Sequence, residues 1–166
     1  MDTSKKANIE VRPPQSAEDQ AWLGQLWLDE WGGDTMVSRG KLYRYEDVSA
    51  VIAWLDGSRV GAATYSFDKD DCELTSINAV ITGSGIGSHL LSFVEQTARE
   101  AGLGRLWFVT TNDNVDALRF YQKRDYRLAA VHVNAIEAAR KLKPSIPAIG
   151  YYGIPIRDEL ELEKLL

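Results

Sequence analysis

The sequence predicts one α/β (α+β) domain in which helices pack on a mixed sheet. Its 166 residues are 45% hydrophobic, which is enough to build a single core. Residues 51–81 have the period of strands and are divided by turn residues. After residue 86, helical and strand periodicities follow one another to residue 133. This order of elements favours helices lying against a sheet that contains both parallel and antiparallel pairs.

The first part of the chain predicts a strand and a helix. Residues 8–12 alternate polar and apolar side chains, and Pro13 and Pro14 end the strand. Ser16 is expected to cap the helix that follows, and Gly32 to end it. Hydrophobic side chains recur through this helix at helical spacing. Core packing is expected for Trp22, Leu23 and Trp27, whereas Trp31, at the helix end, is left open between core and substrate contact.

Three antiparallel strands are expected next, at 51–55, 60–67 and 72–80. The Asp56-Gly57 pair is a strong hairpin signal between the first two. The acidic residues 68–71 are expected to form a second, solvated turn.

Beyond the third of these strands, helices and strands alternate. Apolar residues at helical spacing predict a helix that Gly102 ends, then a strand at 106–110. Residues 112–123 are expected to form another helix, and 127–133 another strand.

The end of the chain combines breakers with apolar residues. Residues 141–157 contain three prolines, yet also many apolar side chains, which predicts a long loop folded over the domain. Residues 159–163 alternate Glu and Leu and predict a last strand with one wet face. We expect one domain over 1–166, with 1–7 as a loose terminus.

Composition excludes several classes of function. A net charge of −5 argues against a nucleic-acid partner. No stretch approaches the ~20 apolar residues that span a bilayer, and the start lacks the apolar core of a signal peptide, so a cytoplasmic protein without a membrane partner is expected.

Cysteine and histidine are too few for several kinds of site. Cys72 is the only cysteine, and His89 and His132 are the only histidines. Neither a disulfide framework nor a Cys/His metal cluster is expected, so no metal is assigned. The residues favour Cys72 as a small buried side chain over a nucleophile.

The glycine turn, residues 82–87, lies between an expected strand and an expected helix. Glycines at 83, 85 and 87 let backbone N–H groups approach an anion, and the start of the helix adds its positive end. This favours a phosphate site, although such turns also serve packing alone. The spacing fits neither the dinucleotide fingerprint nor a P-loop.

A second motif lies downstream of this turn, from Asn114 to Tyr126, with Ala117, Phe120 and Tyr121 at fixed spacing. Together with the glycine turn, it resembles the GNAT superfamily of N-acetyltransferases, whose motifs are Gln/Arg-x-x-Gly-x-Gly/Ala and Asn-x-x-Ala-x-x-Phe-Tyr-x-x-x-Gly-Phe. The resemblance covers residues 72–126. Two positions depart from the pattern: Thr82 stands in place of Gln or Arg, and Asp125 in place of Gly.

The resemblance implies a mostly antiparallel central sheet of about seven strands with helices on both faces. It also implies that acetyl-CoA lies in an opening between the fourth and fifth strands, with its pyrophosphate on the glycine turn. By position in the motifs, the implied cofactor-binding residues are Ile77, Asn78, Ala79, Thr82, Gly83, Ser84, Gly85, Ile86, Gly87, Ser88 and Asn114.

The same resemblance implies two catalytic side chains. Glu73 corresponds to a glutamate that many members use as the base, directly or through water, and a solvated strand carboxylate is the alternative. Tyr121 corresponds to the tyrosine that protonates the coenzyme thiolate, and packing beside Phe120 is the alternative. Backbone N–H groups near Ile77 and Asn78 are expected to stabilise the negative oxygen.

We therefore expect transfer of acetyl from acetyl-CoA to a primary amine by direct attack in a ternary complex. The amine, on a small molecule or a protein, is expected to enter between residues 31–45 and 141–157. Trp31 and Arg39 are weaker candidates for contact with it. Dimers are common in the family, so a homodimer is a further expectation.

Three alternatives stay open at this point. One is an acyltransferase with another acyl-CoA or another acceptor. Another is a module that senses acetyl-CoA or a metabolite without catalysis. A nucleotide-binding α/β domain is disfavoured, because hairpins precede the glycine turn where that fold has parallel strands.

Overall fold

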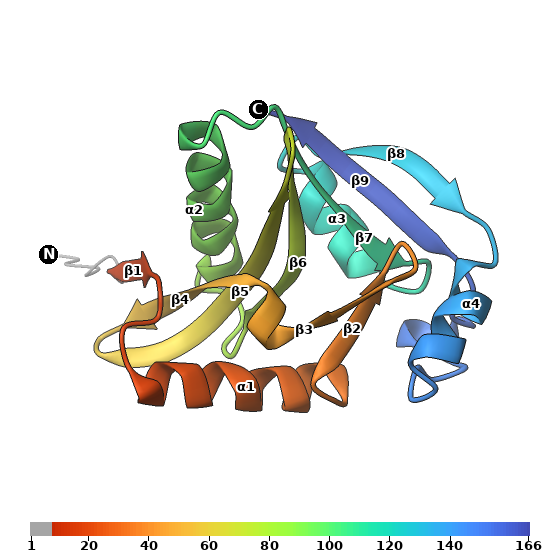
Figure 1. Ribbon diagram of the computed structural model, residues 1–166, viewed down its shortest axis with the longest axis horizontal. Coiled ribbons are helices and arrows are strands. Elements are labelled where there is room, and N and C mark those ends of the chain that lie inside the picture. Colours follow the sequence, from red (N-terminus) through yellow and green to blue (C-terminus); the bar gives the residue numbers. More distant parts are fainter. Residues whose placement is uncertain (1–7) are drawn as a thin grey trace, which may run out of the picture.

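The computed structural model describes residues 8–166 and contains a seven-stranded sheet, a separate hairpin and four α-helices (Figure 1). The expected loose terminus, 1–7, lies outside these residues. The helices are α1 (Ala17–Trp31), α2 (Ile86–Glu100), α3 (Val115–Gln122) and α4 (Ala135–Leu142), with short 3-10 turns at Tyr45–Asp47 and Tyr151–Gly153. The strands are β1 (Ile9–Arg12), β2 (Thr35–Ser38), β3 (Lys41–Arg44), β4 (Ser49–Leu55), β5 (Ser58–Asp68), β6 (Asp71–Ala79), β7 (Arg105–Thr111), β8 (Arg127–His132) and β9 (Glu159–Leu165).

The sheet confirms the predicted fold class. Its strand order is β1-β4-β5-β6-β7-β9-β8, and every neighbouring pair is antiparallel except β6 and β7. Its seven strands are the seven that the sequence predicts, with small shifts at their ends. Figure 1 shows β9 lying between β7 and β8, so the last strand of the chain enters the interior of the sheet.

Helices cover both faces of the sheet, which creates two cores. On one face, α2 packs on β4 to β7 through a cluster that includes Val51, Leu90 and Leu106, all fully buried. On the other face, α1 packs on β4 and β5 through Leu23, Leu26 and Ile52. In Figure 1, α1 and α2 lie on separate sides of β4 and β5.

The predicted helix boundaries in the first half have local causes that the structure confirms. The Ser16 hydroxyl accepts a hydrogen bond from the Asp19 backbone N–H at 3.1 Å and caps α1. Gly32 ends this helix at a φ of 67°, a left-handed conformation that glycine adopts without strain.

Two segments differ from the expected loops. Residues 35–44, inside the expected loop 31–45, form the β2–β3 hairpin around Arg39 and Gly40. The expected loop 141–157 begins inside α4, whose Ile136 and Ala139 are buried against Ile156. Both elements are short, so their periodicity carries little signal in the sequence.

The prediction that one face of β9 is exposed to water is also wrong. Glu159 is only 4% exposed, and the carboxylates of Glu161 and Glu163 both bind Arg105. The alternating pattern correctly predicts a strand, but the polar side chains of β9 form ion pairs within the protein instead of being solvated.

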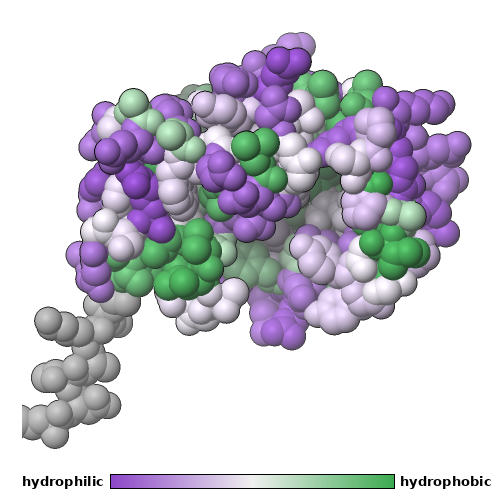
Figure 2. All heavy atoms as spheres, turned by 90° about the horizontal axis from the view of Figure 1, so that it is seen from below, coloured by the Kyte–Doolittle hydropathy of each residue, from purple (hydrophilic) through white to green (hydrophobic). Residues whose placement is uncertain are grey.

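The surface seen from below mixes hydrophilic residues with separate groups of hydrophobic ones (Figure 2). Within residues 8–166, no helix has the length and apolar character needed to cross a membrane.

Candidate active site

β6 and β7 part from each other midway along the sheet. They pair only over Asp71–Glu73, whereas β6 remains paired with β5 as far as Ala79. The edge of β6 that faces β7 therefore has no strand partner beyond Glu73. Ile77, Asn78 and Ala79 lie on this edge, where their backbone groups are available to a ligand.

A β-bulge that the sequence analysis missed lies at the start of this edge. Thr64 of β5 pairs with Ser76 and Tyr65 with Leu74, which leaves Thr75 as the extra residue. The Thr64 hydroxyl lies 2.7 Å from that of Thr75 and 2.5 Å from that of Ser76, and all three residues are buried. This hydroxyl cluster fixes the bulge beside the opening. A run of Thr and Ser in the sequence was its only signal.

The glycine turn leads from β6 into α2 and presents backbone donors. Gly83 and Gly85 have φ values of 79° and 75°, which L side chains rarely adopt. Gly85 precedes the first helical residue, no side chain caps the helix, and its first turn contains no acidic residue. Residues 82–85 are exposed. The first N–H groups of α2 are thus suited to an anion.

Gly87 has a packing role in addition. A Cβ there would lie 3.3 Å from the Phe120 ring, so the glycine allows α2 to lie close to α3. Asn114, at the start of α3, caps that helix: its Oδ1 accepts a hydrogen bond from the Ala117 N–H at 3.2 Å. The Asn114 side-chain N–H₂ group is left for any contact with a ligand.

Glu73 lies at the closed end of the opening and is not the solvated carboxylate of the alternative interpretation. It is 6% exposed, and its two oxygens accept hydrogen bonds from the hydroxyls of Ser38 and Tyr43, both at 2.5 Å. The β2–β3 hairpin supplies both donors. Because no local pattern indicates this hairpin, these partners of Glu73 were not predicted.

The environment of Glu73 raises the pKa of its carboxyl group. Burial is the main cause, hydrogen bonds from Ser38 and Tyr43 and the charge of Lys41 oppose it, and the charge of Glu159 adds to it. A carboxylate with a raised pKa accepts a proton more readily near neutral pH, as a general base requires.

Tyr121 faces the other side of the sheet. Alternate residues of a strand point to opposite faces, and Cys72 and Leu74, on either side of Glu73, belong to the same core cluster as Tyr121. The Tyr121 ring lies 4.0 Å from that of Phe108 of β7. Burial raises the pKa of its phenol, so the group keeps its proton. Packing and a donor role are both compatible with this position.

A cavity of about 390 Å³ opens over Glu73, and we call it the Glu73 cavity. It lies between the β2–β3 hairpin and strands β5 to β7, and its walls include Trp107. Arg39 also lines it, but each of Glu159 and Glu161 lies 4.0 Å from the Arg39 guanidinium. Trp31 is not among the described residues that line this cavity.

Cys72 is fully buried, and burial is the main reason why the pKa of its thiol rises to about 12. The thiolate is the nucleophilic form, so this cysteine is inert near neutral pH. The prediction of a buried, non-nucleophilic side chain agrees with this.

Asp125 adopts the left-handed conformation that the family pattern reserves for glycine, with a φ of 67°. We expect Asp125→Gly to stabilise the protein by ~0.5–1 kcal/mol. Removing the Cβ relieves the steric cost of the left-handed conformation, and this gain exceeds the entropy that glycine adds to the unfolded chain. Urea unfolding measures this change, and Asp125→Ala serves as the comparison because it keeps a Cβ. Equal or lower stability of the glycine variant would contradict this account.

Comparisons with known proteins agree with this fold. A structure of a GNAT family acetyltransferase from Elizabethkingia anophelis with acetyl-CoA bound superposes with a TM-score of 0.71 at 20% identity, covering 96% of this chain and 99% of the other. A Bacillus subtilis acetyltransferase in complex with CoA also gives a TM-score of 0.71, at 18% identity, covering 96% and 99%. The chain thus shares its fold with acetyltransferases whose structures hold acetyl-CoA or CoA.

Sequence comparison specifies the family. Residues 11–126 match the model described as the acetyltransferase (GNAT) family, so the chain belongs to this family. YxbD, an uncharacterised protein of Bacillus subtilis (strain 168), is 44% identical over 145 residues, which cover 87% of this chain and 91% of YxbD.

Proposed function

We propose that the protein transfers an acetyl group from acetyl-CoA to a primary amine by direct attack in a ternary complex. The observation that carries this proposal is the position of Glu73: a buried carboxylate at the point where β6 and β7 part, with the Glu73 cavity over it, where the acceptor amine would lie. In this proposal the amine enters from the face of the sheet that carries Glu73, and the acyl group of acetyl-CoA lies in the opening between β6 and β7.

The free edge of β6 and the glycine turn fit the cofactor. In this proposal the backbone of Ile77, Asn78 and Ala79 holds the pantetheine arm, and the N–H groups of residues 82–88 hold the pyrophosphate. No long side chain is available from Thr82, so the backbone supplies most of this binding. Bound acetyl-CoA supplies the activated acyl group.

Glu73 acts as the base and Tyr121 as the donor to sulfur. An alkylammonium has a pKa of ~10, so its proton must be removed before the nitrogen attacks, and Glu73 accepts it directly or through water. The N–H groups near Ile77 and Asn78 stabilise the negative charge on the acyl oxygen. As the carbon–sulfur bond breaks, the Tyr121 hydroxyl donates its hydrogen to the departing thiolate. The second proton of the nitrogen is lost as the amide forms and restores the phenol through water.

Steady-state kinetics with purified protein test this proposal. Release of CoA is followed over a panel of amines while both substrates are varied. Intersecting double-reciprocal lines are expected, because Cys72 is too poor a nucleophile for an acyl-enzyme. A ping-pong pattern with acetylated Cys72 would overturn direct transfer, and binding of acetyl-CoA without turnover would favour a sensor.

We expect Tyr43→Phe to move the acidic limb of the kcat/KM profile to higher pH. The hydrogen bond from Tyr43 lowers the pKa of Glu73, so its loss raises that pKa further and protonates the base over a wider range. Activity depends on ionised Glu73 and falls as pH drops through this pKa. The measurement is kcat/KM against pH.

Ser38→Ala removes the other donor and should move the same limb in the same direction. Tyr45→Phe is the matched control, because this neighbouring tyrosine packs on Trp27 instead. A profile that keeps its acidic limb in place in both Tyr43→Phe and Ser38→Ala would show that Glu73 is not the titrating base.

A further inference from the structure

Arg124 follows α3, and its guanidinium reaches the first turn of α2. Its Nε and Nη2 atoms donate hydrogen bonds to the Ser88 hydroxyl at 3.1 and 2.7 Å, and Nη1 donates to the Phe120 carbonyl at 2.8 Å. The guanidinium carbon also lies 3.6 Å from the centre of the Phe120 ring. These contacts fix the guanidinium beside the glycine turn.

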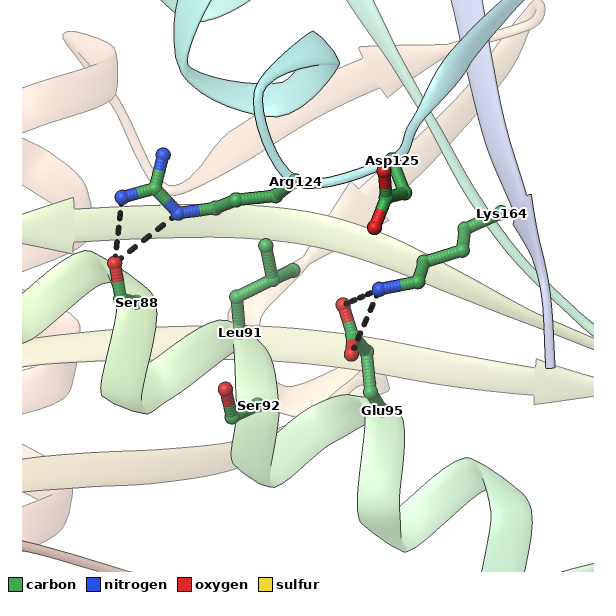
Figure 3. Close-up of a pocket in the computed structure, with 7 residues that line it drawn as sticks. All are labelled: Ser88, Leu91, Ser92, Glu95, Arg124, Asp125 and Lys164. Carbon is green, nitrogen blue, oxygen red and sulfur yellow. Dashed lines mark hydrogen bonds and ion pairs between the residues drawn. The ribbon is translucent and has the colours of Figure 1, made fainter.

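Within residues 8–166, no carboxylate forms an ion pair with Arg124. Arg124 lines a small cavity between α2 and the end of β9, separate from the one over Glu73. Two carboxylates also line it, Asp125 and Glu95, and Glu95 is paired with Lys164 at 3.4 Å. Figure 3 shows the guanidinium extended towards Ser88, away from Asp125 and from the Glu95–Lys164 pair. The positive charge of Arg124 is therefore held where the protein offers no counter-charge.

The position of Arg124 beside the first turn of α2 adds to the electrostatic cost of its positive charge. The N-terminus of a helix carries a partial positive charge from its unpaired N–H groups, and a cation there is repelled. In α2 no acidic side chain in the first turn, and no capping side chain, offsets this charge. A fixed arginine at such a place is favourable when an anion binds between it and the helix.

We infer that Arg124 binds a phosphate group of acetyl-CoA beside the glycine turn and supplies the positive charge that Thr82 does not. This inference rests on the proposed function. The hydrogen bonds of Arg124 to Ser88 and Phe120 engage three of the five N–H groups of the guanidinium, which leaves two for phosphate oxygens. Arginine pairs with phosphate through two such bonds at once.

The test is calorimetric titration of acetyl-CoA into wild type, Arg124→Gln and Arg119→Gln. Arg119 is an exposed arginine on α3, the helix that Arg124 follows, so its replacement is a control for the loss of one charge. Arg124→Gln is expected to raise the Kd about tenfold or more, as for the loss of a charge-assisted contact, and Arg119→Gln to leave it close to wild type. Thermal unfolding without ligand checks that each variant is folded.

Dephospho-CoA and CoA distinguish which phosphate is bound. If Arg124 contacts the ribose phosphate, removal of that phosphate weakens wild type and makes Arg124→Gln no weaker than wild type. If Arg124 contacts the pyrophosphate, the variant stays weaker with both ligands. Equal Kd values for wild type and Arg124→Gln with all ligands overturn the inference alone, whereas a wild type that binds none of them overturns the proposed function as well.

Discussion

Glu73→Gln is expected to lower kcat/KM for the acceptor amine about a hundredfold, at the lower end of the range for general-base catalysis. The substitution keeps the size of the side chain but removes its ability to accept the proton of the amine. The hydroxyls of Ser38 and Tyr43 can donate or accept, so they can still bond to the amide. Initial rates at saturating acetyl-CoA give the effect.

Glu10→Gln is the matched control for this substitution, because the Glu10 side chain is 60% exposed on β1. The affinity of the Glu73→Gln variant for acetyl-CoA should remain that of wild type, since Glu73 lines the Glu73 cavity and not the free edge of β6 proposed for the cofactor. Near-normal kcat/KM in a folded Glu73→Gln variant would remove Glu73 from the mechanism and leave water or another group as the base.

Gly61→Ala is expected to destabilise the protein by ~1–3 kcal/mol, as overpacking in a core does, and to weaken the binding of acetyl-CoA. A Cβ at Gly61 would lie 2.7 Å from the Asn78 carbonyl oxygen and 2.7 Å from Ile86. The first contact is with backbone, which can move only by shifting β6 at the opening. Urea unfolding and calorimetric titration measure the two effects.

Gly104→Ala provides the comparison, because a Cβ at Gly104 meets no atom within 4 Å and its φ is not positive. Its stability and its affinity for acetyl-CoA should stay close to wild type. If Gly61→Ala matched Gly104→Ala in both measurements, the close packing of β5, β6 and α2 would not hold the cofactor edge in place.

Much of the fold could be predicted from local patterns. The strand segments of the sheet, the Ser16 cap and the glycine turn each depend on residues close together in the chain, and the structure confirms them. The β2–β3 hairpin and α4 were missed because each offers too few residues to establish a period. The carboxylates of β9 were misassigned because Arg105, on another strand, is their partner.

Sequence alone therefore determined the seven strands of the sheet, the helices α1 to α3 and the two motifs, since each follows from residue type and spacing. The resemblance that these motifs carry implied Glu73 and Tyr121 as candidates. Only the tertiary structure decided what surrounds them. Glu73 is buried under hydroxyl groups from Ser38 and Tyr43, and Arg124 contacts Ser88. Each of these hydrogen bonds joins residues about 30 or more positions apart. Such contacts depend on how strands and helices pack, and no local pattern in the chain specifies them.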